Sequence, residues 1–276
     1  MTSDLDGLLD RLASLPSIMV AFSGGADSAF LLAAAVRALG AERVEAATAV
    51  SPSLPRSELD RAREFAAGLG VVHHAPGTDE LSREGYRANA GDRCFFCKTE
   101  LMSVVAPLAA ARGIAAVATG TNADDLRAGF RPGIRAAADA GAITPLADAG
   151  LTKAAIRAAS RDWGLDTWDK PAAACLASRI AYGVEVTADG LARVAAAEHS
   201  LRGALAEARI PVRNLRVRDL GDDTAKVEVD AELVAAVADR PGVLAAVEGY
   251  AEVRLDAQGF RSGAMNELLP YPERYR

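Results

Sequence analysis

The sequence predicts an α/β protein in which a parallel sheet carries helices on both faces, followed by a smaller α+β domain. Short apolar runs alternate with longer amphipathic segments up to about residue 120, a pattern typical of strand–helix–strand units. After residue 171 the order becomes helix, two strands, short helix and strand, which fits a separate module. The 276 residues suffice for two domains, which we place at 1–170 and 171–276.

The elements of the first domain follow from the spacing of their apolar residues. Helices are expected where these recur every three or four positions, and strands where they run together. Helices are predicted over 5–15, 28–39, 57–68 and 99–112, and strands over 18–22, 44–50, 71–74 and 115–119. Right-handed crossovers would bring the loops that follow these strands to one edge of the sheet, where ligands gather in such folds.

The second domain is predicted from the same periodicities. A helix is expected over 188–208, strands over 215–220 and 225–229, a short helix over 231–238 and a final strand over 251–255. Near the end of the first domain, Thr152 has the chemistry of a helix N-cap, so a further helix is expected to begin at Lys153.

Charge and hydropathy limit the classes of partner. Lys and Arg number 31 against 37 Asp and Glu, a formal charge of −6, so we expect no general nucleic-acid surface. No run of about 18 uninterrupted apolar residues occurs and the first residues do not form a secretory signal. We therefore expect no membrane span and a cytoplasmic location.

The stretch SGGADS joins the first predicted strand to the next helix. Gly24 and Gly25 allow a tight turn and a close approach of backbone N–H groups to a ligand, and the helix start favours negative charge. Ser23 and Ser28 add hydroxyl groups, and Asp27 is a candidate Mg²⁺ ligand. The alternative is a structural turn in which Ser28 only caps the helix.

Three cysteines leave several chemistries open. Cys94 and Cys97 have C-x-x-C spacing just before the predicted helix 99–112, and Cys175 stands far along the chain. The preferred hypothesis is three thiolates around a [4Fe-4S] cluster with one open iron. The alternatives are a redox pair with a buried Cys175, three unrelated cysteines, or a zinc site completed by a histidine: His73, His74 or His199.

Arginines near Cys175 are the candidates for binding an anionic substrate. Ser178 and Arg179 follow the cysteine directly, while Arg216 and Arg218 alternate along a predicted strand and so share one face. The alternative for Arg216 and Arg218 is a solvated polar strand face.

SGGADS resembles the S-G-G-x-D-S PP-loop of the N-type ATP pyrophosphatases, whose members cleave ATP between the α and β phosphates. The resemblance implies that five residues bind pyrophosphate and Mg²⁺: Ser23, Gly24, Gly25, Asp27 and Ser28. It also implies a nucleotide or metal role for Thr121, Asn122 and either Asp124 or Asp125 in TGTNADD, where a plain helix N-cap turn is the alternative.

Six stretches together are similar to the LarE family: SGGADS, RCFFCKTEL, TGTNADD, AGLTKAAIR, KPAAACLASRIAYG and GFRSGAMNELL. Members are ATP-dependent sulfur transferases that convert carboxylates of pyridinium-3,5-biscarboxylic acid mononucleotide into thiocarboxylates, for the nickel-pincer nucleotide cofactor. Some sacrifice a single cysteine, which corresponds to Cys175; others add two cysteines and bind a [4Fe-4S] cluster, as Cys94 and Cys97 suggest for this chain.

The family resemblance further implies ATP and Mg²⁺ as cosubstrate and cofactor, a homo-oligomer, and functional neighbours that carboxylate the precursor and insert nickel. Two other functions compete with this reading. A tRNA 2-thiolation enzyme of the same superfamily would carry a basic face or an added RNA-binding module, neither of which the sequence shows. A non-catalytic ATP-binding module would leave the three cysteines without a role.

Overall fold

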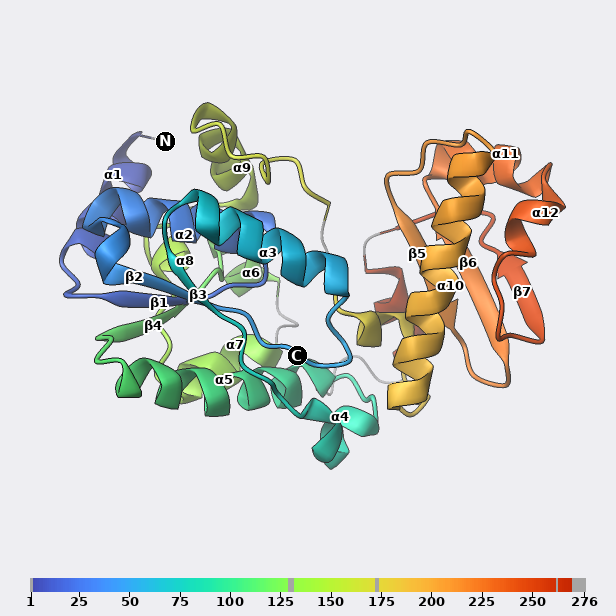
Figure 1. Cartoon of the computed structure of the whole chain (residues 1–276), viewed down its shortest axis with the longest axis horizontal. Helices are drawn as coiled ribbons and strands as arrows, with labels where there is room; N and C mark the ends of the chain where they lie inside the picture. Colours follow the sequence, from blue (N-terminus) through green and yellow to red (C-terminus); the bar gives the residue numbers. More distant parts are fainter. Residues whose placement is uncertain (1, 129–131, 172–173, 262, 270–276) are drawn as a thin grey trace. The chain divides into compact units, whose positions relative to one another are not determined.

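In a computed structural model, which describes residues 2–128, 132–171, 174–261 and 263–269, the chain forms two compact units (Figure 1). The first unit contains residues up to Glu80 and those from Cys94 to 171, and the second contains Leu81–Arg93 and the described residues from Ala174 onward. The segment 81–93 thus packs with residues far away in sequence.

A four-stranded parallel sheet forms the centre of the first unit. Its strands are β1 (Ile18–Ala21), β2 (Val44–Ala47), β3 (Val72–His74) and β4 (Ala116–Thr119). They lie in the order β3-β2-β1-β4, and Ile18 pairs with both Val44 and Ala116. The chain runs outward in opposite directions from β1, so a crevice is expected where β1 and β4 end side by side.

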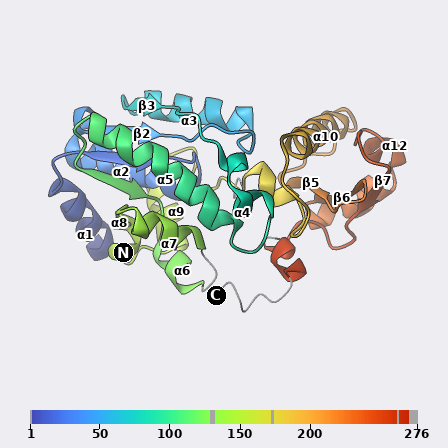
Figure 2. The same ribbon diagram turned by 90° about the horizontal axis from the view of Figure 1, so that it is seen from below.

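Helices cover both faces of this sheet (Figures 1 and 2). On one face, side chains of β1 and Phe22 meet α2 (Ala26–Leu39), with α1 (Thr2–Ala13), α3 (Arg56–Gly68) and α9 (Lys153–Asp162) completing the layer. On the other face, Met19 and Ala47 contact Val105 and Ala109 of α5 (Arg93–Ala111). The predicted parallel sheet with helices on both faces is confirmed.

Four short helices connect these elements. They are α4 (Glu84–Arg87), α6 (Ala123–Arg127), α7 (Pro132–Asp139) and α8 (Pro145–Asp148). The sequence pattern did not predict them, because helices of four to eight residues show too little periodicity to stand out.

The second unit packs one long helix against a three-stranded sheet. The sheet contains β5 (Leu215–Asp219), β6 (Thr224–Val229) and β7 (Glu252–Leu255), with β5 and β6 antiparallel and β6 and β7 parallel. Leu201 and Leu205 of α10 (Ala188–Glu207) pack on Val217 and Val227. Two short helices, α11 (Val234–Ala238) and α12 (Pro241–Leu244), complete the unit. A smaller α+β module is therefore present, as predicted.

Several predicted helix boundaries are wrong. Helix α1 spans Thr2–Ala13 and not 5–15. Helix α2 begins at Ala26 and not at Ser28, and α5 begins at Arg93 and not at Thr99. The predicted helix 231–238 divides into a 3₁₀ turn, Ala231–Leu233, and α11. Helix ends depend on local capping and on tertiary packing, which weak residue propensities do not encode.

Helix α5 is, in the described part of the chain, the one helix whose length and apolar composition would allow it to cross a membrane: 19 residues with a mean hydropathy of 1.4. It also carries Lys98 and Glu100 and packs on the sheet through Met102, Val105 and Ala109. A helix that covers a sheet satisfies the same criteria of length and composition.

The packing of α2 yields a stability prediction. Phe30 is fully buried and its ring stacks on Trp163 at 4.8 Å, so Phe30→Ala leaves a large cavity. We expect the free energy of unfolding to fall by about 3–5 kcal/mol, measured by urea denaturation. Leu126→Ala, at a side chain that is 55% exposed, is the control and should change it by less than about 0.5 kcal/mol. Equal losses in the two variants would contradict the packing described.

Candidate functional site

The turn after β1 exposes the start of α2 to a ligand. Gly24 has φ +70°, a left-handed conformation that favours glycine. Gly25 is the N-cap of α2 and no side chain caps the first turn, so its N–H groups face outward, as in anion sites. Ser28 therefore lies within α2, which excludes the interpretation of Ser28 as the N-cap.

Two hydroxyl groups lie beside this turn. The Oγ atoms of Ser23 and Ser28 are 3.1 Å apart, and Ser28 Oγ donates to Gly25 O at 3.1 Å. The backbone amide of Gly25 donates weakly to Ser23 Oγ at 3.4 Å. Ser23 is exposed and Ser28 is buried, so the pair reaches from the solvent to the base of the turn.

The loop after β4 contacts the start of α2 directly. A Cβ atom placed on Gly120 would lie 2.9 Å from the backbone nitrogen of Ser28, so only glycine allows this approach. The next residues bring Thr121, whose Oγ1 is 3.0 Å from Oγ1 of Thr119, and Asn122 to the same edge. The structure thus brings together the two stretches that the sequence predicted as one nucleotide site.

Asn122 connects the two loops. It is fully buried, and its Nδ2 donates to Oδ2 of Asp27 at 3.1 Å. Asn122 also caps α6: its Oδ1 accepts from the amide of Asp125 at 3.0 Å, and Asp125 Oδ2 accepts from the amide of Asn122. The N-cap alternative for TGTNADD is therefore confirmed, and the same residue contacts Asp27.

Asp27 faces a second carboxylate. The pKa of Asp27 is raised, first by burial and then by the negative charge of Asp125, while Lys153, Asn122 and Arg157 oppose the rise. A divalent cation would remove the repulsion, and two carboxylates with hydroxyl groups nearby form an oxygen donor set that suits Mg²⁺.

Lys153 and Asp124 link this cluster to α9. Lys153 Nζ lies 2.9 Å from Asp125 Oδ1, and the backbone amide of Lys153 donates to Asp124 Oδ2 at 2.9 Å. Thr152 caps α9 as predicted, with its Oγ1 accepting from the amide of Ala155. Both carboxylates thus contact Lys153, and Asp125 is the one whose negative charge raises the pKa of Asp27.

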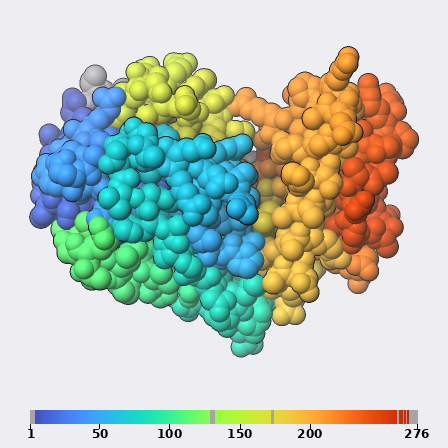
Figure 3. Space-filling model, in the orientation of Figure 1, coloured from blue at the N-terminus to red at the C-terminus, as the bar shows by residue number. Residues whose placement is uncertain are grey.

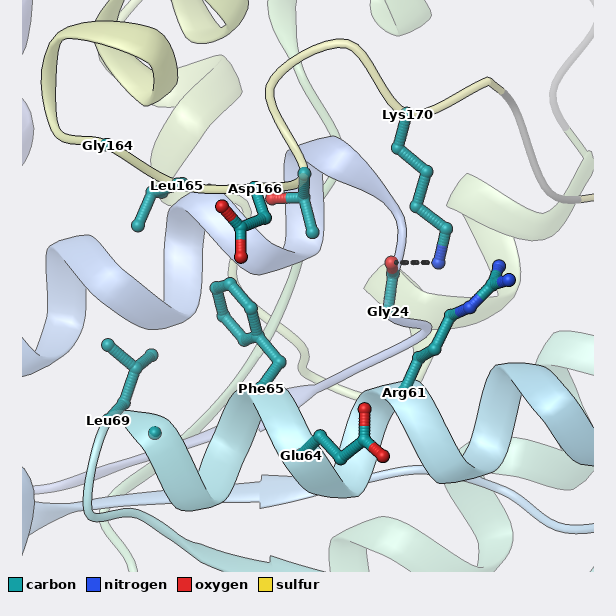
Figure 4. A pocket seen from close by; sticks show the side chains of 11 residues that line it. Gly24, Arg61, Glu64, Phe65, Leu69, Gly164, Leu165, Asp166 and Lys170 are labelled. Carbon is teal, nitrogen blue, oxygen red and sulfur yellow. Dashed lines mark hydrogen bonds between the residues drawn. The ribbon is translucent and has the colours of Figure 1, made fainter. Parts of the chain in front are cut away.

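Lys170 holds the turn from the opposite side. Its Nζ donates to Gly24 O at 2.8 Å (Figure 4). The same Nζ donates to Glu58 Oε2 at 2.6 Å. The ammonium group of Lys170 therefore contacts the backbone of the turn itself.

A cavity of about 540 Å³ opens beside Lys170 and Gly24, between α3 and the segment after α9 (Figure 4). Arg61 and Phe65 line it from α3, and Asp166 from the other side. The surfaces of these two segments border each other on one face of the first unit (Figure 3).

The cysteines are divided between the two units. Cys94 and Cys97 lie in the first turns of α5, and Cys175 precedes a 3₁₀ turn, Leu176–Arg179, in the second unit. The expectation that both residues of the C-x-x-C motif precede a helix is wrong; spacing i, i+3 within α5 still places them on one helix face. None of the three forms a disulfide, and Cys94 is exposed while the other two are partly exposed.

This thiol set fits a metal cluster by its chemistry, since three accessible cysteines without a disulfide can all supply thiolates. Within the described residues of either unit taken alone, no group of three or more His, Cys, Asp or Glu side chains is placed to hold a metal. Two candidate zinc histidines have other partners: His73 Nε2 contacts Thr48 at 2.8 Å and His74 Nε2 contacts Glu45 at 2.6 Å.

Ser178 and Arg179 hold the turn that carries Cys175. Ser178 Oγ donates to Cys175 O at 2.7 Å, and Arg179 Nη1 donates to Cys175 O at 3.0 Å and also to Ala174 O. Arg179 is 4% exposed and pairs with both carboxylate oxygens of Glu198. In the structure these two predicted substrate residues support the backbone around Cys175.

Arg216 and Arg218 are buried, so the alternative of a solvated strand face is wrong. Arg218 pairs with Glu228 through Nε and Nη2 and donates to Ser178 O at 3.0 Å. Arg216 lies over the ring of Phe260 and donates to Leu215 O. Burial, followed by the nearby charge of Arg179, lowers the pKa of Arg216 to about 10. An anion beside Arg216 would relieve this excess of positive charge.

Several residues that complete these sites were not predicted as site residues. Glu58 and Lys153 contact the first-unit cluster, while Glu198 and Glu228 balance the buried arginines of the second. Each lies in a helix or strand among ordinary charged residues, and only its tertiary partner distinguishes it.

Comparison with known proteins gives three relatives, while no family model matches. An uncharacterized protein of Synechocystis is 38% identical over 98% of this chain and 99% of its own length. The pyridinium-3,5-bisthiocarboxylic acid mononucleotide synthase of Lactiplantibacillus plantarum is 34% identical over 95% of this chain and 93% of its own. An uncharacterized protein of Methanocaldococcus jannaschii is 29% identical over 50% of this chain and 55% of its own.

The raised pKa of Asp27 predicts a gain of stability on neutralisation. Asp27→Asn removes a partly buried charge, so its melting temperature at pH 8 should exceed that of the wild type. Because the wild-type carboxyl is itself protonated at low pH, the gain should shrink as the pH falls toward about 4, the ordinary range of the Asp pKa. Differential scanning calorimetry across this range checks the result; a variant that is less stable at pH 8 would contradict it.

The contact at Gly120 predicts a separate loss of ligand binding. Gly120→Ala forces the β4 loop away from the first turn of α2, and we expect MgATP affinity to fall by at least about tenfold, measured by isothermal titration calorimetry. Gly7→Ala is the matched control, since a Cβ at Gly7 meets nothing within 4 Å. Unchanged affinity in Gly120→Ala would show that the two loops do not form one site.

Proposed function

The chain belongs to the LarE family, the pyridinium-3,5-bisthiocarboxylic acid mononucleotide synthases, and from this premise we propose that it is an ATP-dependent sulfur transferase. Its substrate is pyridinium-3,5-biscarboxylic acid mononucleotide, whose carboxylates become thiocarboxylates in synthesis of the nickel-pincer nucleotide. The observation that carries the proposal is the arrangement at the ends of β1 and β4, where the uncapped start of α2 meets Asp27 and Asp125.

The first step activates the carboxylate. A carboxylate oxygen of the substrate attacks the α-phosphorus of ATP, the bond from phosphorus to the β-phosphate oxygen breaks, and pyrophosphate leaves. The amides at the start of α2, with the Ser23 and Ser28 hydroxyls, donate to the pyrophosphate oxygens as their charge grows. Asp27 and Asp125 would hold a Mg²⁺ ion, which offsets the same charge.

The second step forms the carbon–sulfur bond. Sulfide attacks the carbonyl carbon of the acyl adenylate, the bond to AMP breaks, and AMP leaves with the former carboxylate oxygen, so a thiocarboxylate remains. Cys94, Cys97 and Cys175 would hold a [4Fe-4S] cluster, whose open iron supplies the bound sulfide. Ser178 and Arg179 keep the Cys175 backbone in place during this step.

The substrate phosphate has a matching site in the second unit. Burial and the neighbouring charge of Arg179 lower the pKa of Arg216, so a bound anion would favour its charged form, whereas Arg218 is paired with Glu228. We therefore assign phosphate binding chiefly to Arg216, with Arg218 fixing the strand beside it. A cytoplasmic homo-oligomer that acts between carboxylating and nickel-inserting proteins completes the proposal.

The test begins with iron and acid-labile sulfide on protein purified without oxygen. About four of each per chain are expected, and replacement of Cys94, Cys97 or Cys175 by Ala should abolish both. Ser103→Ala, an exposed position of α5, is the matched control and should keep full iron. In parallel, wild-type protein with ATP and the mononucleotide should release pyrophosphate and form thiocarboxylate, and Asp27→Asn should slow both by about 100-fold or more.

Absence of iron after reconstitution would overturn the cluster assignment. Loss of H₂S from Cys175 after turnover, detected by mass spectrometry as dehydroalanine, would then identify Cys175 as a sacrificial sulfur donor. Failure to release pyrophosphate with any carboxylate substrate would overturn the adenylation itself.

A further inference from the structure

Two buried polar residues outside the sites described above lie in the segment 81–93, which belongs to the second unit. Asn89 is fully buried and Arg93 is 5% exposed. Asn89 has φ +52°, a left-handed conformation that is uncommon for residues other than glycine and that Asn adopts more readily than most. Its Oδ1 accepts a hydrogen bond from Arg93 Nη1. A strained conformation kept in a buried polar pair indicates a specific role.

The Asn89–Arg93 pair binds the segment that follows Cys175. Asn89 Nδ2 lies 2.7 Å from Ala181 O, 2.8 Å from Val184 O and 3.3 Å from Ile180 O. Arg93 Nη1 also donates to Ala177 O at 2.8 Å. Three of these four carbonyl groups belong to buried residues, so removal of the donors would leave polar groups without compensation and loosen the segment.

Arg93 also lies on the same helix as the other two cysteines. It is the first residue of α5, and Cys94 follows it directly. Cys97 stands four positions after Arg93, so helical spacing places the two on the same face of α5. Arg93 therefore belongs both to the helix that carries the C-x-x-C motif and to the hydrogen-bond network of the Cys175 segment.

We propose that Asn89 and Arg93 are positioning residues that hold the backbone segment after Cys175 in place. The role rests on the proposed function, in which Cys175 acts with Cys94 and Cys97 in sulfur delivery. Neither residue touches the reacting atoms; they act by keeping the backbone from Ala177 to Val184 in one conformation.

The first test measures how fast Cys175 is alkylated, and it assumes nothing about the reaction. In a Cys94→Ser, Cys97→Ser background, Cys175 is the remaining cysteine of the chain, and its alkylation by iodoacetamide can be timed. Asn89→Gly keeps the left-handed backbone and removes the amide, while Arg93→Met keeps the bulk and removes the guanidinium. Each should raise the alkylation rate about tenfold, because local opening becomes easier.

The matched control is Arg87→Met. Arg87 lies on the same segment and forms an ion pair with Glu185, with side chains 39% and 64% exposed, so its replacement should leave the alkylation rate within about twofold of the parent. Rates within twofold for Asn89→Gly and Arg93→Met as well would overturn the proposal. If Arg93→Met fails to fold, Asn89→Gly alone decides the outcome.

The second test uses the full chain with all three cysteines. Arg93→Met should release pyrophosphate at a rate within about twofold of the wild type, because the ATP site lies in the other unit, and should form thiocarboxylate at least about tenfold more slowly. Arg87→Met should keep both rates. A general loss of folding would instead lower both rates together and would contradict a positioning role.

The outcomes separate this proposal from the proposed function. A wild-type protein that binds no iron and transfers no sulfur overturns the function, yet faster alkylation in the variants still supports the positioning of Cys175. A wild-type protein that transfers sulfur, with variants that are alkylated at the parent rate, overturns the positioning role alone.

Discussion

The contact between Gly120 and the first turn of α2 is the constraint on which the first-unit site depends. Because no Cβ intervenes, the loop after β4 approaches the backbone of Ser28 closely enough for Asn122 to reach Asp27. That contact holds Asp125 beside Asp27 and places both carboxylates at the uncapped helix start. A larger residue would separate the two loops and, with them, the start of α2 from Asn122 and Asp125.

The charges of this site oppose its stability and serve its chemistry. Two neighbouring carboxylates and an uncapped helix start are each unfavourable without a ligand, and each becomes favourable when a cation and a phosphate are bound. Lys170 and Lys153 reduce part of the imbalance, the first at the Gly24 carbonyl and the second at Asp125. Where the local charges are unfavourable in the free protein, a ligand of opposite charge stabilises the protein most when it binds.

In the second unit, the arginines near Cys175 are buried. Its arginines are not a solvated patch: Arg179 and Arg218 are paired with Glu198 and Glu228, and they support the backbone around Cys175 and Ser178. Arg216 keeps a depressed pKa among them. Residue type alone did not distinguish the arginines that pair with glutamates from Arg216, because the difference lies in their tertiary partners.

The sequence by itself determined the fold class, the parallel order of strands and helices, and the SGGADS turn, because apolar periodicity and glycine placement act locally. It also indicated Thr152 as a helix cap, which the structure confirms. Only the tertiary structure decided that α5 begins at Arg93, that Asn122 contacts Asp27, and that Asn89 binds the backbone carbonyl groups of residues that follow Cys175. These depend on partners up to 95 positions apart, and no local pattern specifies which distant residues meet.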